Sequence, residues 1–257
     1  MSRFSANTNA HHLHDILERV RNSGKQRVRD GWAIALEAPF GDADFVRMHS
    51  EVANLLSATC RDVDALGGRQ SDRVSQYFPA WWSAVVYPNG SWIGDVGCQN
   101  LISEQALDML AVTADLIAGA LAGSSAAPRG GDLSDLREKC EEWLTLLEEI
   151  PSGSISDGTR DQLSVQVAHL IWLIDNVNLF GGARVAQQTE GLVGSLTQAV
   201  GGLPNASPLR GKLGAAVVTL MSVLFVFNQG TEIAQTSIEN AKGVVREITQ
   251  TYEGLTD

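Results

Sequence analysis

A chain of 257 residues, 44% of them hydrophobic and 19% charged, can bury one large or two medium-sized cores, which excludes an intrinsically disordered protein. Its formal net charge of −11 and isoelectric point near 4.9 make nucleic acid an unlikely partner, because nucleic-acid-binding domains usually carry a basic face.

The cysteine content and the N-terminus bear on the compartment. Cys60, Cys98 and Cys140 are odd in number and lack CxxC spacing, so neither a disulfide framework nor a cysteine zinc site is predicted. The segment MSRFSANTNAHHLHD lacks the apolar core of a secretory signal. We expect a cytoplasmic protein, with association at the inner membrane on activation as an open alternative.

Two short helices are predicted first. Asn7 or Asn9 is the expected cap of the first, which ends near residues 22–24 and has apolar positions at helical spacing: Leu13, Ile16, Leu17 and Val20. The second spans about 25–38 and stops at Pro39. The only basic cluster lies around their junction, and it predicts either a dock for an acidic group or a solvated connector: Arg19, Arg21, Lys25, Arg27 and Arg29.

The first helix also holds the one metal-like constellation. His11, His14 and Asp15 fall at i, i+3 and i+4, and Glu18 follows one turn later, so nitrogen and oxygen ligands share a helix face. No second segment contributes, and solvated side chains are the competing interpretation. We predict no cofactor.

A long helix is predicted over 44–66, ended by Gly67-Gly68, with a clear apolar stripe: Phe45, Met48, Val52, Leu55, Thr59, Val63 and Leu66. His49 lies beside the stripe and is interpreted as a boundary side chain, with a functional histidine as the alternative.

Residues 77–92 hold six aromatic side chains: Tyr77, Phe78, Trp81, Trp82, Tyr87 and Trp92. Because 88–90 read Pro-Asn-Gly, we expect a tight turn and a small β-hairpin near 83–96 that pairs 83–87 with 91–96. The aromatic set is compatible with core packing, with a protein interface and with a platform for a small ligand.

A further helix is predicted from a cap at Ser103 to about Leu121. The next segment, GSSAAPRGG at 123–131, is rich in small residues and reads as a linker. It divides the chain into an N-terminal helical domain (1–123), a linker (124–131) and a C-terminal helical bundle (132–257).

The second half repeats a three- and four-residue apolar spacing in four segments, which is typical of helices packed at shallow angles. The first three seams are Leu133, Leu136, Cys140, Trp143, Leu147 and Ile150; Leu163, Val167, Leu170, Ile174 and Val177; and Val185, Thr189, Leu192, Leu196 and Ala199. The fourth is Ala234, Ile238, Ala241, Val245, Ile248 and Tyr252. Within the second segment, Asp175 is expected to need a partner such as Arg184.

Residues 208–230 form the most apolar stretch, with no charged side chain between Lys212 and Glu232. One face is small or hydroxylated (Gly211, Ala215, Thr219 and Ser222), and the rest includes Val218, Leu224 and Phe225. The stretch is either the buried centre of the C-terminal bundle or a segment that enters a bilayer. The fold class is therefore mainly α.

Catalytic signatures are absent from the sequence: it has no Walker pattern, no GxSxG and no HExxH. This favours a non-enzymatic protein. An enzyme or metalloprotein that uses the N-terminal histidines or an aromatic cleft remains an alternative.

The last 50 or so residues, with the apolar stretch, a break at Asn228-Gln229-Gly230 and an amphipathic end, resemble small helical accessory and effector proteins of bacterial anti-phage defence systems. The resemblance implies a partner-controlled protein that acts on membranes in some cases, and it transfers no site residues. We expect an assembly or effector protein with a protein partner or self-association. The alternative is a soluble adaptor or antitoxin-like module.

Overall fold

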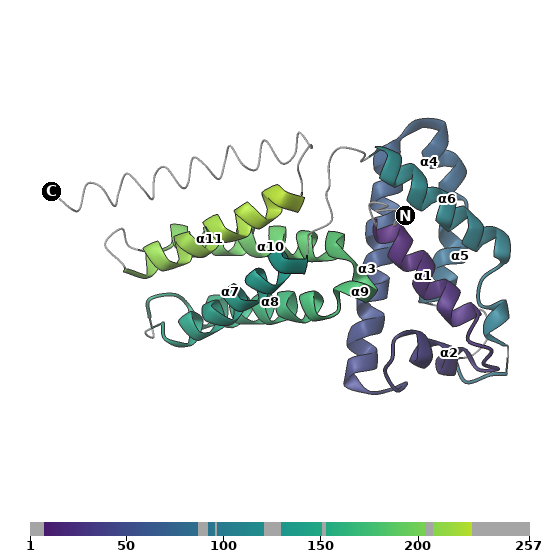
Figure 1. Ribbon diagram of the computed structural model, residues 1–257, viewed down its shortest axis with the longest axis horizontal. Coiled ribbons are helices and arrows are strands. Elements are labelled where there is room, and N and C mark those ends of the chain that lie inside the picture. The colour runs from purple at the N-terminus through teal and green to yellow at the C-terminus, as the bar shows by residue number, and fades with distance from the viewer. Residues whose placement is uncertain are drawn as a thin grey trace. The chain divides into compact units, whose positions relative to one another are not determined.

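The computed structural model describes residues 8–86, 92–95, 97–120, 130–150, 153–203 and 208–227. At 130–132, 208 and 223–227 it describes the backbone alone. The described residues are helical, with turns and short loops between the helices, and contain no strand (Figure 1). The prediction of a mainly α fold is confirmed.

The chain folds into two compact units. Unit 1 comprises residues 1–122 together with 178–181, and unit 2 comprises 123–177 and 182–257. Helix α7 begins at Gly130, so the last two residues of the predicted linker are helical, whereas 121–129 lie outside the described residues.

Unit 1 is built on α1, which packs against α2, α3, α6 and the short turn η1. Its elements are α1 (Asn9–Arg21), α2 (Val28–Ala35), α3 (Ala43–Leu66), α4 (Gly68–Ser75), α5 (Phe78–Val85), η1 (Cys98–Asn100), α6 (Glu104–Ala120) and most of α9 (Val177–Phe180). The stripe predicted for the first helix, Leu13, Ile16, Leu17 and Val20, is buried at this centre. Burial of such aliphatic side chains stabilises a fold by about 1.5–3 kcal/mol each.

The cap of α1 differs from the prediction. Thr8 is the N-cap, in an extended backbone conformation, and its hydroxyl accepts from the backbone N–H of His11 at 3.4 Å. In return, the backbone N–H of Thr8 donates to Nδ1 of His11 at 3.2 Å. This capping box satisfies backbone N–H donors that have no partner within the first turn of a helix. It gives His11 a structural role.

The predicted β-hairpin is wrong. Residues 83–85 belong to α5, and Trp92–Asp95 form a turn and a bend, while 87–91 and 96 lie outside the described residues. Pro79 stands in the first turn of α5, where its missing N–H leaves no hydrogen bond unmade. The spacing of Trp81, Ala84 and Val85, all buried, is helical.

Among its described residues, unit 2 has four long helices whose axes run in nearly the same direction (Figure 1): α7 (Gly130–Glu148), α8 (Asp157–Asp175), α10 (Gly182–Gly201) and α11 (Pro208–Phe227). Helix α7 packs on α8, α8 on α10, and α10 on α11, which also contacts α7. The seams predicted for the first three helices are buried throughout except Val177. The fourth predicted seam, 234–252, lies outside the described residues.

The ion-pair partner of Asp175 differs from the prediction. Asp175 is half-exposed and pairs with Arg137 of α7 at 2.8 Å, whereas Arg184 is buried and donates to Gln187 at 2.9 Å. The partner of Asp175 is therefore Arg137, which comes from the neighbouring helix rather than from the following one.

Helix α11 buries one face, formed by Leu213, Ala216, Val217 and Leu220. The opposite face is not covered by the described residues, because Val218 is 40% exposed and Ala215 and Ser222 are also exposed. Within the described residues, α11 is thus one of four packed helices, with two of them as its neighbours.

Candidate functional site

An open apolar groove lies between α3 and α5 in unit 1, and we call it the Trp82 groove. Its volume is about 890 Å³. Helix α3 contributes Ala53, Leu56, Ser57, Cys60, Arg61 and Asp64, which recur on one helix face. Helix α5 and its C-cap contribute Phe78, Pro79, Trp82, Ser83 and Val86.

The groove exists because α5 is apolar on two sides. One side, with Trp81, Ala84 and Val85, packs into the core, and the indole N–H of Trp81 donates to the carbonyl of Ala106 at 2.8 Å. The other side leaves Trp82 50% and Val86 42% exposed. A helix with no charged residue, placed at the surface, leaves apolar area that a binding partner can cover.

Charge and titration in the groove favour binding over covalent chemistry. Burial, assisted by the nearby carboxylate of Asp64, raises the pKa of Cys60 to about 11. The thiol is therefore protonated at neutral pH and is a poor nucleophile. Arg61 and Asp64 are exposed, so the lining holds one charge of each sign.

The six aromatic residues predicted as one interface or ligand platform occupy different places. Phe78 and Trp82 line the groove, and Trp81 is core. The hydroxyl of Tyr77 accepts from the side-chain amide of Gln105 at 3.1 Å, at the edge of α5. Tyr87 lies outside the described residues, and Trp92 joins a second group of rings.

That second group surrounds His49, which sequence analysis placed at the boundary of α3. The imidazole makes edge contacts with Trp32 and Trp92, at centroid separations of 4.9 and 5.2 Å, and stacks on Phe45 at 5.8 Å. Burial lowers the pKa of His49, and a hydrogen bond to the backbone of Val85 opposes this. His49 therefore ties α3 to α5 beside the groove.

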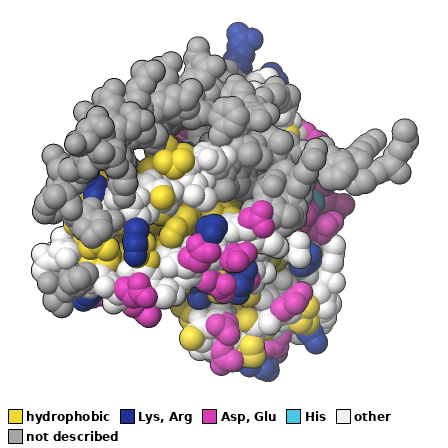
Figure 2. Space-filling view, turned by 60° about the vertical axis from the view of Figure 1, so that its left-hand side comes forward, with side chains coloured by type: hydrophobic (Ala, Val, Ile, Leu, Met, Phe, Trp, Pro, Cys, Tyr) yellow, Lys and Arg dark blue, Asp and Glu magenta, His cyan; other side chains and the backbone are white. Residues whose placement is uncertain are grey.

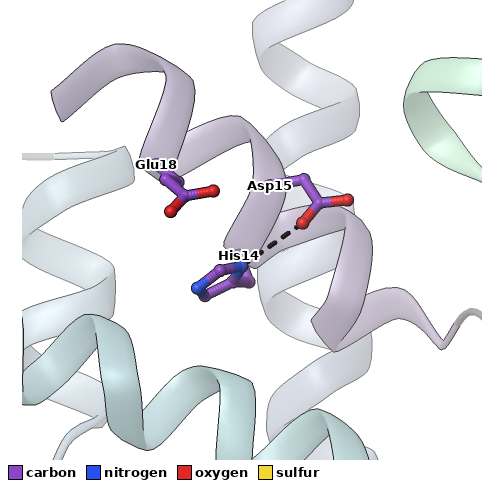
Figure 3. A group of neighbouring side chains, drawn as sticks. All are labelled: His14, Asp15 and Glu18. Carbon is purple, nitrogen blue, oxygen red and sulfur yellow. Dashed lines mark hydrogen bonds and ion pairs between the residues drawn. The ribbon is translucent and has the colours of Figure 1, made fainter. Parts of the chain in front are cut away.

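The N-terminal metal candidates are only partly brought together. His11 is occupied by the cap of α1, and its Nε2 lies 3.4 Å from a carboxylate oxygen of Asp115. Figure 3 shows His14, Asp15 and Glu18 instead, with Nδ1 of His14 3.3 Å from Asp15. Ligand atoms of these three lie within 4.8 Å of one another. All three come from one helix, and both carboxylates are exposed, so the surroundings do not fix a coordination geometry.

The apolar-helix residues predicted from sequence are exposed, half-buried or at positions whose side chains are not described. Thr219 and Ser222 direct their hydroxyls to carbonyls of their own helix, at 3.0 and 2.9 Å, which satisfies them without a neighbour. Gly211 is half-buried, and the side chains of Leu224 and Phe225 lie outside the description. Among the helices in the described ranges, none combines the length and hydropathy that a bilayer-spanning helix needs.

The basic cluster is mostly paired. Arg27 contacts Asp95 at 3.1 Å, Arg29 contacts Asp30 at 3.3 Å, and Arg21 lies 3.8 Å from Glu104. Backbone hydrogen bonds also join 25–29 to 92–98. On the face shown in Figure 2, the basic and acidic side chains of described residues lie interspersed. We therefore assign the cluster to the stability of unit 1.

Unit 2 has a second cavity, of about 470 Å³, lined by hydroxyl and amide side chains at the start of α8 and the end of α10. The hydroxyl of Ser156 accepts from the backbone N–H of Thr159 at 3.0 Å and so caps α8. The described lining holds no charged side chain, and its polar character fits a hydrated surface cavity.

Comparison with known proteins returns no relative: no family model, no curated protein and no solved structure matches the chain.

Proposed function

We propose that this protein is a non-enzymatic helical binding protein that acts by assembly, and that the Trp82 groove is where unit 1 takes the apolar side chains of a protein partner. The observation that carries the proposal is the half-exposed indole of Trp82 beside an open apolar groove. Tryptophan is enriched among residues that dominate binding energy at protein interfaces.

Three further features support binding rather than catalysis. Cys60, whose thiol belongs to the described lining of the groove, has its pKa raised to about 11. The imidazole of His49, which is half-buried on α3, is in contact with three aromatic rings. The groove lining offers hydroxyl groups and one charge of each sign at its polar positions, which suits the rim of a protein interface.

The resemblance of the C-terminal stretch supports a role for this assembly in a bacterial defence or stress response, and the cysteine usage supports a cytoplasmic location. Action on a membrane is the alternative, and it is supported by the exposed, uncharged face of α11 around Val218. In that case the C-terminal unit would act on the bilayer after unit 1 has bound its partner.

The test is site-specific photo-crosslinking of the full chain in the cell. A photoreactive p-benzoylphenylalanine is placed at position 82 or, as the matched control, at position 165, where Val165 is 69% exposed on α8 of unit 2. We expect protein adducts of discrete mass from position 82 and none from position 165. Equal labelling from both positions, or no adduct from position 82, would contradict the proposal.

A second readout uses the thiols. Cys60 is half-buried in the groove, whereas Cys98 and Cys140 are buried. Alkylation of the native protein is expected at Cys60 first and to accelerate as the pH approaches 11. A partner seated in the groove should slow this reaction, and a partner bound elsewhere should not.

A further inference from the structure

We propose that the occupant of the Trp82 groove is a second copy of this chain, in a two-fold symmetric dimer. This inference rests on the proposed function, because it names the partner of the same groove. The argument uses the shape of the groove, the charges in its lining and the net charge of the chain.

The groove lining combines the two features that a contact with its own copy requires. It offers both an apolar hollow, lined by Leu56 and Phe78, and an apolar projection, the half-exposed indole of Trp82. In an isologous interface the same surface is presented by both subunits, so residue i of one contacts residue j of the other and the reverse. A surface that has a hollow and a projecting side chain next to each other can bind another copy of itself, because the projection of each copy enters the hollow of the other.

The charges of the lining are also self-complementary. Arg61 and Asp64 lie three residues apart on α3, both are exposed, and neither forms an ion pair with another described residue. A two-fold axis passing between them sets Arg61 of each copy against Asp64 of the other. The result is two ion pairs of equal geometry across the interface.

The net charge of −11 opposes association of two copies, so the local charge of the groove decides whether a second copy can bind there. Two acidic molecules repel each other, so they approach most easily where the local charge is balanced. The groove lining contains one positive and one negative side chain and is therefore such a place. A surface selected for a basic ligand would instead show several carboxylates around the apolar residues.

The experiment measures the mass of the purified full chain by light scattering after size exclusion, over a range of concentrations. The expected mass rises to twice the monomer mass of 27.5 kDa as the concentration increases. Trp82→Ala should weaken the dimer roughly 30-fold, the effect of removing an interface hot spot. Val165→Asp, on exposed α8, should leave the dimer unchanged.

Charge reversal provides the sharper test. Arg61→Asp alone and Asp64→Arg alone each set like charges against one another twice, and each should raise the dissociation constant about tenfold or more. Mixing the two single variants should restore a dimer, because two negative side chains of one subunit then face two positive ones of the other. The double variant Arg61→Asp/Asp64→Arg should also dimerise like the wild type.

The outcomes separate this inference from the function on which it rests. A chain that stays monomeric at every concentration, or a dimer that resists Trp82→Ala and both charge reversals, overturns the inference. If photo-crosslinking at position 82 then yields adducts of another mass, the groove still binds a different protein and the proposed function survives. If position 82 yields no adduct, the proposed function fails as well.

Discussion

Trp81 and Trp82 are adjacent in the sequence and have opposite surroundings. Trp81 is fully buried with its indole N–H bonded to Ala106, and Trp82 is half-exposed. Trp81→Phe removes the donor and some packing volume, so we expect a loss of about 1–3 kcal/mol in the free energy of unfolding. Trp82→Phe should change it by less than about 0.5 kcal/mol. Urea unfolding measures the free energy of unfolding of both variants, and amide exchange in α6 shows whether the contact with Ala106 is lost. Equal losses of stability in the two variants would contradict the different surroundings of Trp81 and Trp82.

His12 gives unit 1 a pH dependence. Burial lowers the pKa of His12, against the opposing effects of Asp15 and a hydrogen bond to the backbone of Leu179. The unfolded chain therefore binds a proton near pH 6.5 and the folded chain only at lower pH, so stability is complete above that value and falls as the pH drops below it. His49, whose pKa burial also lowers, adds the same sign.

The measurement is the free energy of unfolding at pH 7.5 and pH 5. His12→Gln should reduce the difference between the two pH values, because it removes the titration of this imidazole. A variant with the same pH dependence as the wild type would show that His12 is as accessible to protons in the folded chain as in the unfolded one.

At the scale of elements, the long amphipathic helices were predictable because apolar spacing alone determines which face is buried. The seam from Leu133 to Ile150 and the stripe from Phe45 to Leu66 show this, since the predicted positions are buried apart from Met48 and Leu66, which are half-buried. The predicted ends of helices were less accurate. For example, Thr8, rather than an asparagine, supplies the N-cap of α1.

Helix α5 could not be predicted in the same way. Its sequence, FPAWWSAV, contains three aromatic residues, which favour strands, and the following Pro-Asn-Gly suggested a hairpin. Tertiary packing overrides that preference, since Trp81, Ala84 and Val85 reach the core from one helix face. The usable signal was Pro79 in a first-turn position. The groove depends on this helix. The residues Phe78 and Trp82 could therefore be named from the sequence, but the groove that they line could not be predicted.

At the scale of the whole molecule, unit 1 is discontinuous in sequence. Residues 178–181 belong to it, Phe180 is fully buried, and Gly181 adopts a positive φ of 80°. A Cβ at Gly181 would overlap the imidazole of His12. No periodicity in the sequence indicates that four residues after α8 complete the first unit.

Phe180→Ala is therefore expected to destabilise unit 1 rather than unit 2, by about 3–5 kcal/mol, because it leaves a cavity in the core of unit 1. Hydrogen exchange resolved by helix measures this: protection should fall in α1 and remain in α7 and α10. Loss of protection confined to α7 and α10 would contradict the assignment of 178–181 to unit 1.

The late position of these four residues has a consequence for biosynthesis. A ribosome that has completed residue 122 must add 59 more residues (181 − 122) before the missing piece of unit 1 exists. At about 5–20 residues per second this takes roughly 3–12 s. During that interval the nascent chain exposes the apolar surface that Phe180 later covers, and α7 and α8 of unit 2 are translated before unit 1 can reach its final form.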